Sequence, residues 1–142
     1  MTRLTPQENC IVHDSLNRAS QHEEFIDIFY DDFFHNATGA LQFFKVVDME
    51  RQKKKLRSTL KTLIQAIDEE PGLEFYLEYL ARMHQRFHIP PEMYEVWVDS
   101  LMVALRRCDP LFCQSQEELW RRVLQHSVDI LSGVEVEHYH SA

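Results

Sequence analysis

His84 is the residue whose type and position point most directly to chemistry. It follows an apolar helical pattern that starts at Pro71, and its imidazole falls on the same face as Leu80. An imidazole on the apolar face of a helix is expected to be buried and neutral, which suits a metal ligand. Pro90 and Pro91 must stop this helix, because proline has no backbone N–H and cannot continue the hydrogen-bond ladder. The turn that follows leaves space for a flat ligand beside His84.

A second group of residues can form the opposite wall of such a pocket. Tyr30 offers a hydroxyl donor, Gln52 offers an amide donor, and Leu56 lies one helical turn past Gln52 on the same face. Two simpler interpretations remain open. Tyr30 is then a core tyrosine with its hydroxyl at the surface. Gln52 is then solvent-facing, which its neighbours Lys53 and Lys54 favour, because both are expected to point to water.

Helical signals that would position these residues recur along the whole chain. Capping boxes are expected at residues 5–8 and 115–118, and Asp48 is expected to cap a long helix. The apolar spacing predicts helices over about 6–16, 20–34, 49–64, 71–84 and 91–108, with a last helix that begins at the second box and passes Leu131. A short aromatic connector covers residues 41–44. No strand-like alternation or repeat is found. We therefore expect one all-α domain of about six to seven helices over residues 1–142, with a flexible tail at about 136–142.

Composition restricts the class of protein further. The net charge of −8 argues against nucleic-acid binding, with the basic run at 51–57 as a local exception. Cys10, Cys108 and Cys113 have no metal-like spacing and predict free thiols in a reducing compartment. No stretch is apolar enough for a membrane span, and the N-terminus lacks the apolar core of a signal peptide. A cytoplasmic protein is expected.

The order and spacing of these residues resemble the globin family, in particular bacterial single-domain globins and the haem domains of flavohaemoglobins. Phe29-Tyr30 resembles the distal Phe-Tyr pair of that family, and Phe44 resembles the phenylalanine that wedges against haem. Gln52 with Leu56 resembles the distal glutamine and leucine, and Leu80-Ala81-x-x-His84 resembles the proximal histidine motif. The resemblance implies the globin fold, a sandwich of three helices on three, with haem b and its iron as the cofactor.

The resemblance also implies a role for each site residue. His84 would bind iron while its other ring nitrogen bonds a carbonyl near Leu80, and Tyr30 with Gln52 would stabilise a distal ligand. The residues expected to contact haem or His84 are Phe43, Phe44, Leu56, Phe87, Ile89, Tyr94, Trp97 and Glu135. Tyr94 would orient Glu135, and Glu135 would make the imidazole more anionic. A satisfied core histidine and a solvated carboxylate remain the alternatives for His84 and Glu135.

Two departures from the family pattern concern this pocket. Leu124 stands where many relatives have a haem-contacting tyrosine, and Trp97 stands where a smaller side chain is usual.

The implied function is reversible binding of oxygen, nitric oxide or another diatomic gas. A pocket lined with donors fits slow oxygen release, and therefore nitric oxide dioxygenation or other gas and redox detoxification, better than bulk oxygen transport. Because this sequence contains no reductase, an external electron donor is expected. A gas or redox sensor that acts on a partner protein, and a helical module without haem, are the alternatives. The sequence leaves the oligomeric state open.

Overall fold

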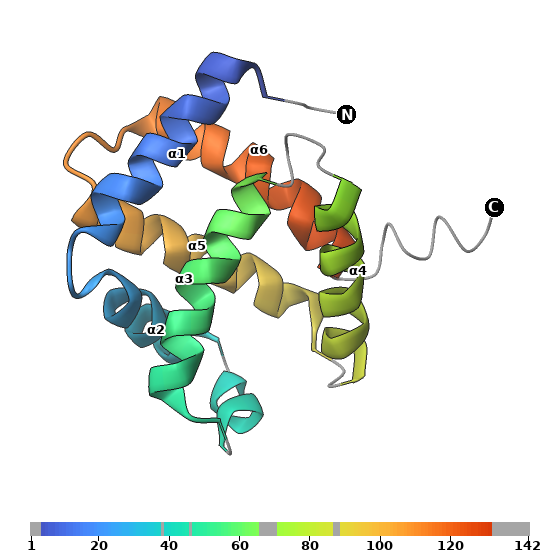
Figure 1. Ribbon diagram of the computed structural model, residues 1–142. Coiled ribbons are helices and arrows are strands. Elements are labelled where there is room, and N and C mark those ends of the chain that lie inside the picture. The colour runs from blue at the N-terminus through green and yellow to red at the C-terminus, as the bar shows by residue number, and fades with distance from the viewer. Residues whose placement is uncertain (1–3, 38, 46, 66–70, 87–88, 132–142) are drawn as a thin grey trace.

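The part of the chain that the structure describes folds into six α-helices and one short 3₁₀ helix (Figure 1). The computed structural model describes residues 4–37, 39–45, 47–65, 71–86 and 89–131. In chain order the elements are α1 (Pro6–Ser20), α2 (Phe25–Asn36), η1 (Ala40–Phe44), α3 (Met49–Gln65), α4 (Pro71–Arg86), α5 (Pro91–Cys108) and α6 (Gln114–Leu131). The described residues include no strand, and the all-α prediction is confirmed.

Three helix starts lie where the sequence signals place them. The Thr5 hydroxyl accepts a hydrogen bond from the Glu8 backbone N–H at 3.1 Å, and the Glu8 carboxylate accepts one from the Thr5 N–H at 2.9 Å. This reciprocal pair satisfies two backbone donors that a helix start leaves free. Asp48 Oδ1 accepts a bond from the Glu50 N–H at 3.1 Å, and Pro91 is the first residue of α5.

Two other starts differ from the prediction. α2 begins at Phe25 rather than near residue 20, because the chain first turns at His22, whose carbonyl and Nδ1 accept bonds from the N–H groups of Phe25 and Glu24. The prediction of a capping box at residues 115–118 is also wrong. α6 already begins at Gln114, and the Cys113 carbonyl accepts the Glu117 N–H at 3.0 Å. Ser115 therefore lies inside the first turn.

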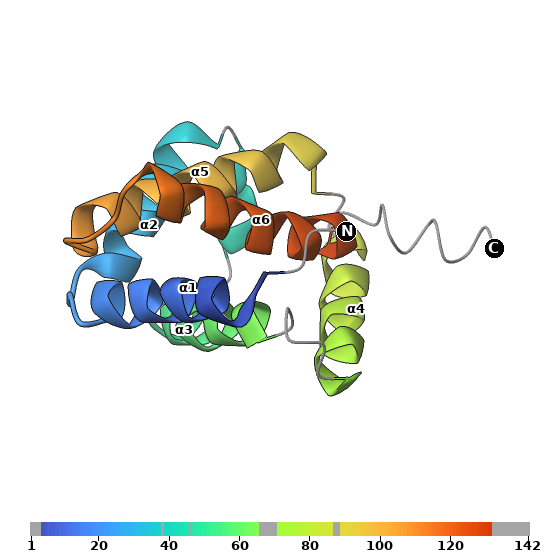
Figure 2. The ribbon, with the colours of Figure 1, turned by 90° about the horizontal axis from the view of Figure 1, so that it is seen from above.

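The helices form two layers (Figure 2). α1 and α3 lie side by side, with α4 at the end of this layer, and they face α2, α5 and α6. The side chains between the layers are apolar, and the largest fully buried ones are Trp120, Phe25, Phe29, Leu60, Leu101, Met102, Leu105, Leu124 and Val12. The predicted sandwich of three helices on three is confirmed. Among the described helices none has the length and apolarity needed to cross a membrane.

Candidate functional site

His84 lies in the last turn of α4, and a backbone contact fixes its ring. Its Nδ1 atom lies 2.7 Å from the carbonyl oxygen of Leu80, one turn earlier in the same helix. A carbonyl oxygen can only accept a hydrogen bond, so Nδ1 must hold the proton. In the neutral ring Nε2 then keeps its lone pair, which is the form that binds a metal. The bond expected near Leu80 is therefore present, and it prepares Nε2 as a ligand atom.

Tyr30 and Gln52 come together from α2 and α3. Tyr30 is only 4% exposed, so its hydroxyl is held inside the molecule. Burial raises the pKa of Tyr30, and a side-chain hydrogen bond with Gln52 partly offsets this increase. Gln52 on α3 therefore acts on the buried hydroxyl of Tyr30 on α2.

Lys53 corrects an expectation from the sequence. It was expected to point to water, but its Nζ lies 2.7 Å from Oδ1 of Asp27 on α2, and its side chain is only 30% exposed. This ion pair joins α2 to α3 beside the Tyr30–Gln52 contact. Gln52, the preceding residue on α3, is half-buried rather than solvent-facing. The pair joins two residues far apart in sequence, and no local pattern predicts it.

Aromatic rings hold Tyr30 in place. The ring centroid of Phe44, in η1, lies 6.1 Å from that of Tyr30 in an edge-on arrangement, and Phe34 lies 5.6 Å from Tyr30 and 5.2 Å from Phe44. Edge-on and stacked pairs at these distances are favourable. The chain reaches η1 through Gly39, whose φ of +84° is in the left-handed region that glycine adopts without strain. The cluster orients the Tyr30 ring next to α3.

Tyr94 in α5 lies near His84, with ring centroids 6.3 Å apart. Its hydroxyl donates to the carbonyl oxygen of Leu131 at 3.2 Å, at the end of α6. Burial raises the pKa of Tyr94 to about 12, so the phenol stays protonated at neutral pH. Tyr94 therefore links His84 to the end of α6. Its predicted contact with Glu135 concerns a residue that lies outside the described chain.

The structure places the remaining predicted residues as follows. Leu56 is buried and Leu124 is fully buried, while Phe43 and Ile89 are half-buried. Trp97 is half-buried, and its ring lies edge-on to Phe29 with centroids 5.4 Å apart. Phe87, like Glu135, lies outside the described residues.

A separate groove lies on the surface between α5 and α6. Its volume is about 440 Å³, and it is lined by Pro91, Tyr94, Glu95, Val98, Asp99, Arg121, Gln125, Val128 and Asp129. Arg121 forms an ion pair with Asp99 at 3.0 Å in this groove. The groove shares Tyr94 with the site described above, but His84, Tyr30 and Gln52 do not line it.

Comparisons with known proteins identify the family and the fold. The family model described as Globin matches residues 28–131, a range that includes Tyr30, Gln52 and His84. Among solved structures, the chain is similar to protein PA3967 from Pseudomonas aeruginosa PAO1, which is described as structurally highly homologous to a human haemoglobin. The TM-score is 0.84 with 25% sequence identity, and the match covers 89% of this chain and 96% of that one. The comparison with curated proteins gave no match.

Proposed function

Because this chain belongs to the globin family, we propose that it binds haem b through His84 and binds oxygen reversibly beside Tyr30 and Gln52. The globin family generally binds haem. We further propose that the physiological reaction is the oxidation of nitric oxide to nitrate by bound oxygen, with electrons from an external donor in the cytoplasm.

The observation that carries the proposal is the hydrogen bond from His84 Nδ1 to the Leu80 carbonyl oxygen, at 2.7 Å. It leaves Nε2 as the donor atom that iron needs. The bond also holds the ring in one orientation, so a metal ligand is ready before the cofactor binds. Bound haem would supply the iron that takes up oxygen and transfers electrons.

Tyr30 and Gln52 stabilise the bound gas in this proposal. Oxygen on ferrous haem has partial negative charge, and donors aimed at it slow its release. Hydrogen bonds to charged groups contribute about 1.5–3 kcal/mol, which corresponds to roughly ten- to a hundredfold in lifetime. Burial raises the pKa of Tyr30, so its hydroxyl stays protonated, and the influence of Gln52 on this pKa supports a joint role of the two side chains.

Apolar side chains keep water away from the same region. Leu56 is 5% exposed and follows Gln52 by one helical turn, while Phe44 packs against Tyr30. In such an environment a hydrogen bond is stronger than in water. We propose that Phe43, Phe44, Leu56, Ile89, Trp97 and Phe87 form the apolar walls of the haem pocket.

The proposal includes a contact from Glu135 to His84. The Tyr94 hydroxyl supports it, because its bond to the Leu131 carbonyl holds the end of α6 beside the His84 ring. An acceptor carboxylate on the imidazole would lower the reduction potential of the iron and favour redox chemistry over transport.

Absorption spectra of the purified protein, supplemented with haem, test the proposal. We expect a Soret band that shifts on reduction and again on oxygenation, and the oxygenated protein should convert added nitric oxide to nitrate. If the protein binds oxygen but forms no nitrate, the proposed dioxygenase activity is wrong and the proposed gas binding is retained. Absence of haem binding would contradict the whole proposal and favour a helical interaction module.

A further inference from the structure

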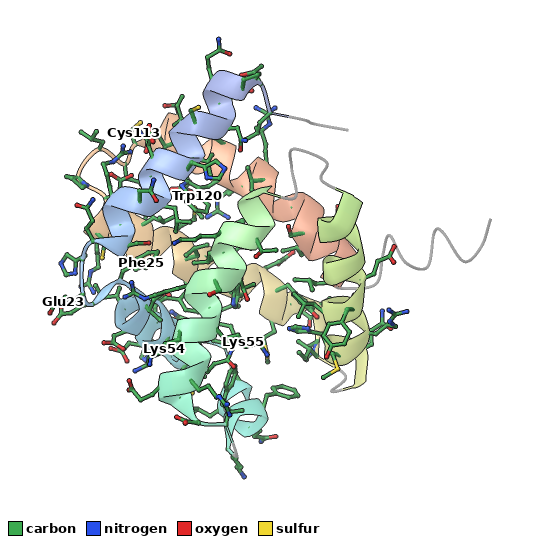
Figure 3. All side chains as sticks on the ribbon, viewed as in Figure 1. Glu23, Phe25, Lys54, Lys55, Cys113 and Trp120 are labelled. Atoms are coloured by element: carbon green, nitrogen blue, oxygen red, sulfur yellow. The ribbon has the colours of Figure 1, made fainter. Side chains whose placement is uncertain are left out.

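The outer surface of α3 is strongly basic although the chain is acidic overall. Arg51, Lys54, Lys55 and Lys61 are exposed, and their spacing places them within one third of the helix circumference. We call these four residues the α3 basic face. After Glu50 in its first turn, α3 contains no Asp or Glu, whereas the net charge of the chain is −8. Figure 3 shows Lys54 and Lys55 on α3, which crosses the front of the molecule.

The charges of this face are not neutralised by the rest of the described chain. Four other cations have carboxylate partners: Lys53 pairs with Asp27, Arg18 with Asp109, Arg106 with Glu117 and Arg122 with Glu8. Within the described residues, no ion pair is formed by the α3 basic face. A cluster of like charges on one helix is unfavourable for folding, because i,i+4 pairs of equal sign repel each other. A partner of opposite charge would remove this repulsion.

The position of the face relative to the candidate haem site suggests which partner. Gln52 and Leu56 lie on the inner side of α3, and the basic face lies on the outer side of the same helix. A helix with its side chains is about 10–12 Å across. A partner on the basic face would therefore sit about one helix thickness from the candidate haem site.

We propose that the α3 basic face is the docking surface for an acidic one-electron donor protein of the ferredoxin class. This inference rests on the proposed function, which requires an external donor. In the transfer, one electron leaves the iron–sulfur cluster of the donor and reduces ferric haem iron to ferrous, and no bond is made or broken. Opposite charges would steer the encounter and fix its orientation.

The charge distribution favours an acidic protein over the other polyanions. Duplex DNA is an extended polyanion, so it would reach beyond the α3 basic face to the acidic remainder of the surface, whereas a small acidic protein can contact the face alone. A lipid surface normally requires apolar side chains beside the cations, and the exposed large apolar residues of the described chain, Ile11, Leu41, Tyr79 and Leu111, are not on α3. From Arg51 to Lys61 the face extends about 15 Å, which suits one contact patch of a small protein.

Stopped-flow reduction of the ferric holoprotein by a reduced plant-type [2Fe–2S] ferredoxin tests the proposal. The double variant Lys54→Glu/Lys55→Glu should lower the second-order rate constant at low salt by about tenfold or more, and high salt should slow the wild type. The matched control is Arg106→Glu/Arg107→Glu, two adjacent exposed cations on α5 with the same charge change. It should change the rate by less than about threefold.

Binding gives a readout that does not depend on electron transfer. Oxidised ferredoxin should perturb the backbone amide resonances of the exposed face of α3 in the wild type, and these perturbations should disappear in Lys54→Glu/Lys55→Glu. If Lys54→Glu/Lys55→Glu and Arg106→Glu/Arg107→Glu give the same reduction rate and the same resonance perturbations, the proposed docking site is wrong. It is also wrong if duplex DNA or phosphatidylserine vesicles bind in a way that depends on Lys54 and Lys55 when ferredoxin does not bind.

The two proposals fail in different ways. Photoreduction with a small neutral deazaflavin should give the ferrous spectrum in wild type and variants alike. If no haem spectrum is obtained, the proposed function is wrong. If the haem is reduced by deazaflavin but the ferredoxin rate is independent of Lys54, Lys55 and salt, only the docking site is wrong.

Discussion

The Ser15 hydroxyl donates a hydrogen bond of 2.6 Å to Oδ2 of Asp109, although 94 positions separate the two residues. Arg18 also donates to this carboxylate, from Nε to Oδ1 at 2.6 Å and from Nη2 to Oδ2 at 3.1 Å. The indole N–H of Trp120 donates to the Ser15 oxygen at 3.0 Å. Asp109 therefore joins α1 to the corner between α5 and α6 through a side chain with no exposed surface.

Replacing Asp109 should cost much of the stability of the fold. Asp109→Ala removes a buried carboxylate that accepts hydrogen bonds from the part-buried Arg18 guanidinium, and hydrogen bonds to charged groups contribute about 1.5–3 kcal/mol. Urea unfolding followed by circular dichroism measures this loss. Arg106→Ala is the control, because Arg106 is 56% exposed in its pair with Glu117 and such pairs contribute about 0–1 kcal/mol. Equal losses in the two variants would contradict the structural role of Asp109.

The same carboxylate should make stability depend on acid pH. Burial by itself raises the pKa of Asp109, but hydrogen bonds from Arg18, Ser15 and the Leu111 backbone outweigh it and hold the pKa below the ordinary 3.8. The folded state thus binds this proton more weakly than the unfolded state does. The stabilisation is complete at pH values above the pKa of Asp109 in the unfolded protein. It is lost as the pH falls through the pKa of Asp109 in the folded protein, so the loss occurs below about pH 4.

The free energy of unfolding as a function of pH checks this assignment. Asp109→Asn should be less stable than the wild type at neutral pH, and the difference should shrink below about pH 4. Comparison with this variant isolates Asp109 from other carboxylates with lowered pKa values, such as Glu117. A difference that stays constant down to the lowest pH would contradict the predicted linkage.

Tyr30→Phe should accelerate oxygen release without unfolding the protein. The variant keeps the ring that packs against Phe44 and removes only the hydroxyl. Loss of a hydrogen bond to a partly charged ligand corresponds to about ten- to a hundredfold in the dissociation rate. Stopped-flow displacement of oxygen measures this rate. The control Tyr79→Phe removes a hydroxyl from a side chain on α4 that is 53% exposed, and it should leave the rate unchanged. Equal rates in all three proteins would exclude Tyr30 as the donor.

Local signals in the sequence predicted much of the fold. The Thr5 and Asp48 caps and the Pro91 start depend on interactions within a few residues, so their pattern is visible in sequence. The spacing of Tyr30, Gln52 and His84, together with the family resemblance, indicated a pocket between α2, α3 and α4. The structure shows the bond from His84 to Leu80 and a buried Tyr30 whose pKa is affected by Gln52.

Interactions between distant segments were not predictable in this way. No sequence pattern near Asp109 indicates its role, because its partners Ser15 and Arg18 lie on α1. The sequence predicts a solvent-facing Lys53, because its partner Asp27 lies on another helix and no local pattern indicates the ion pair. The box at Ser115 had the right residue types, but the helix had already started one residue earlier. A local motif gives the capacity for a contact, and packing decides whether the contact is made.

The most direct test of the account is the absorption spectrum of His84→Gly, reconstituted with haem, before and after addition of imidazole. We predict that the variant loses the Soret and visible bands of the wild-type ferrous and oxygenated forms, because iron has lost its protein ligand. Free imidazole should restore those bands by occupying the cavity left by the side chain. A variant whose spectra match the wild type in every state, without imidazole, would show that His84 is not the iron ligand.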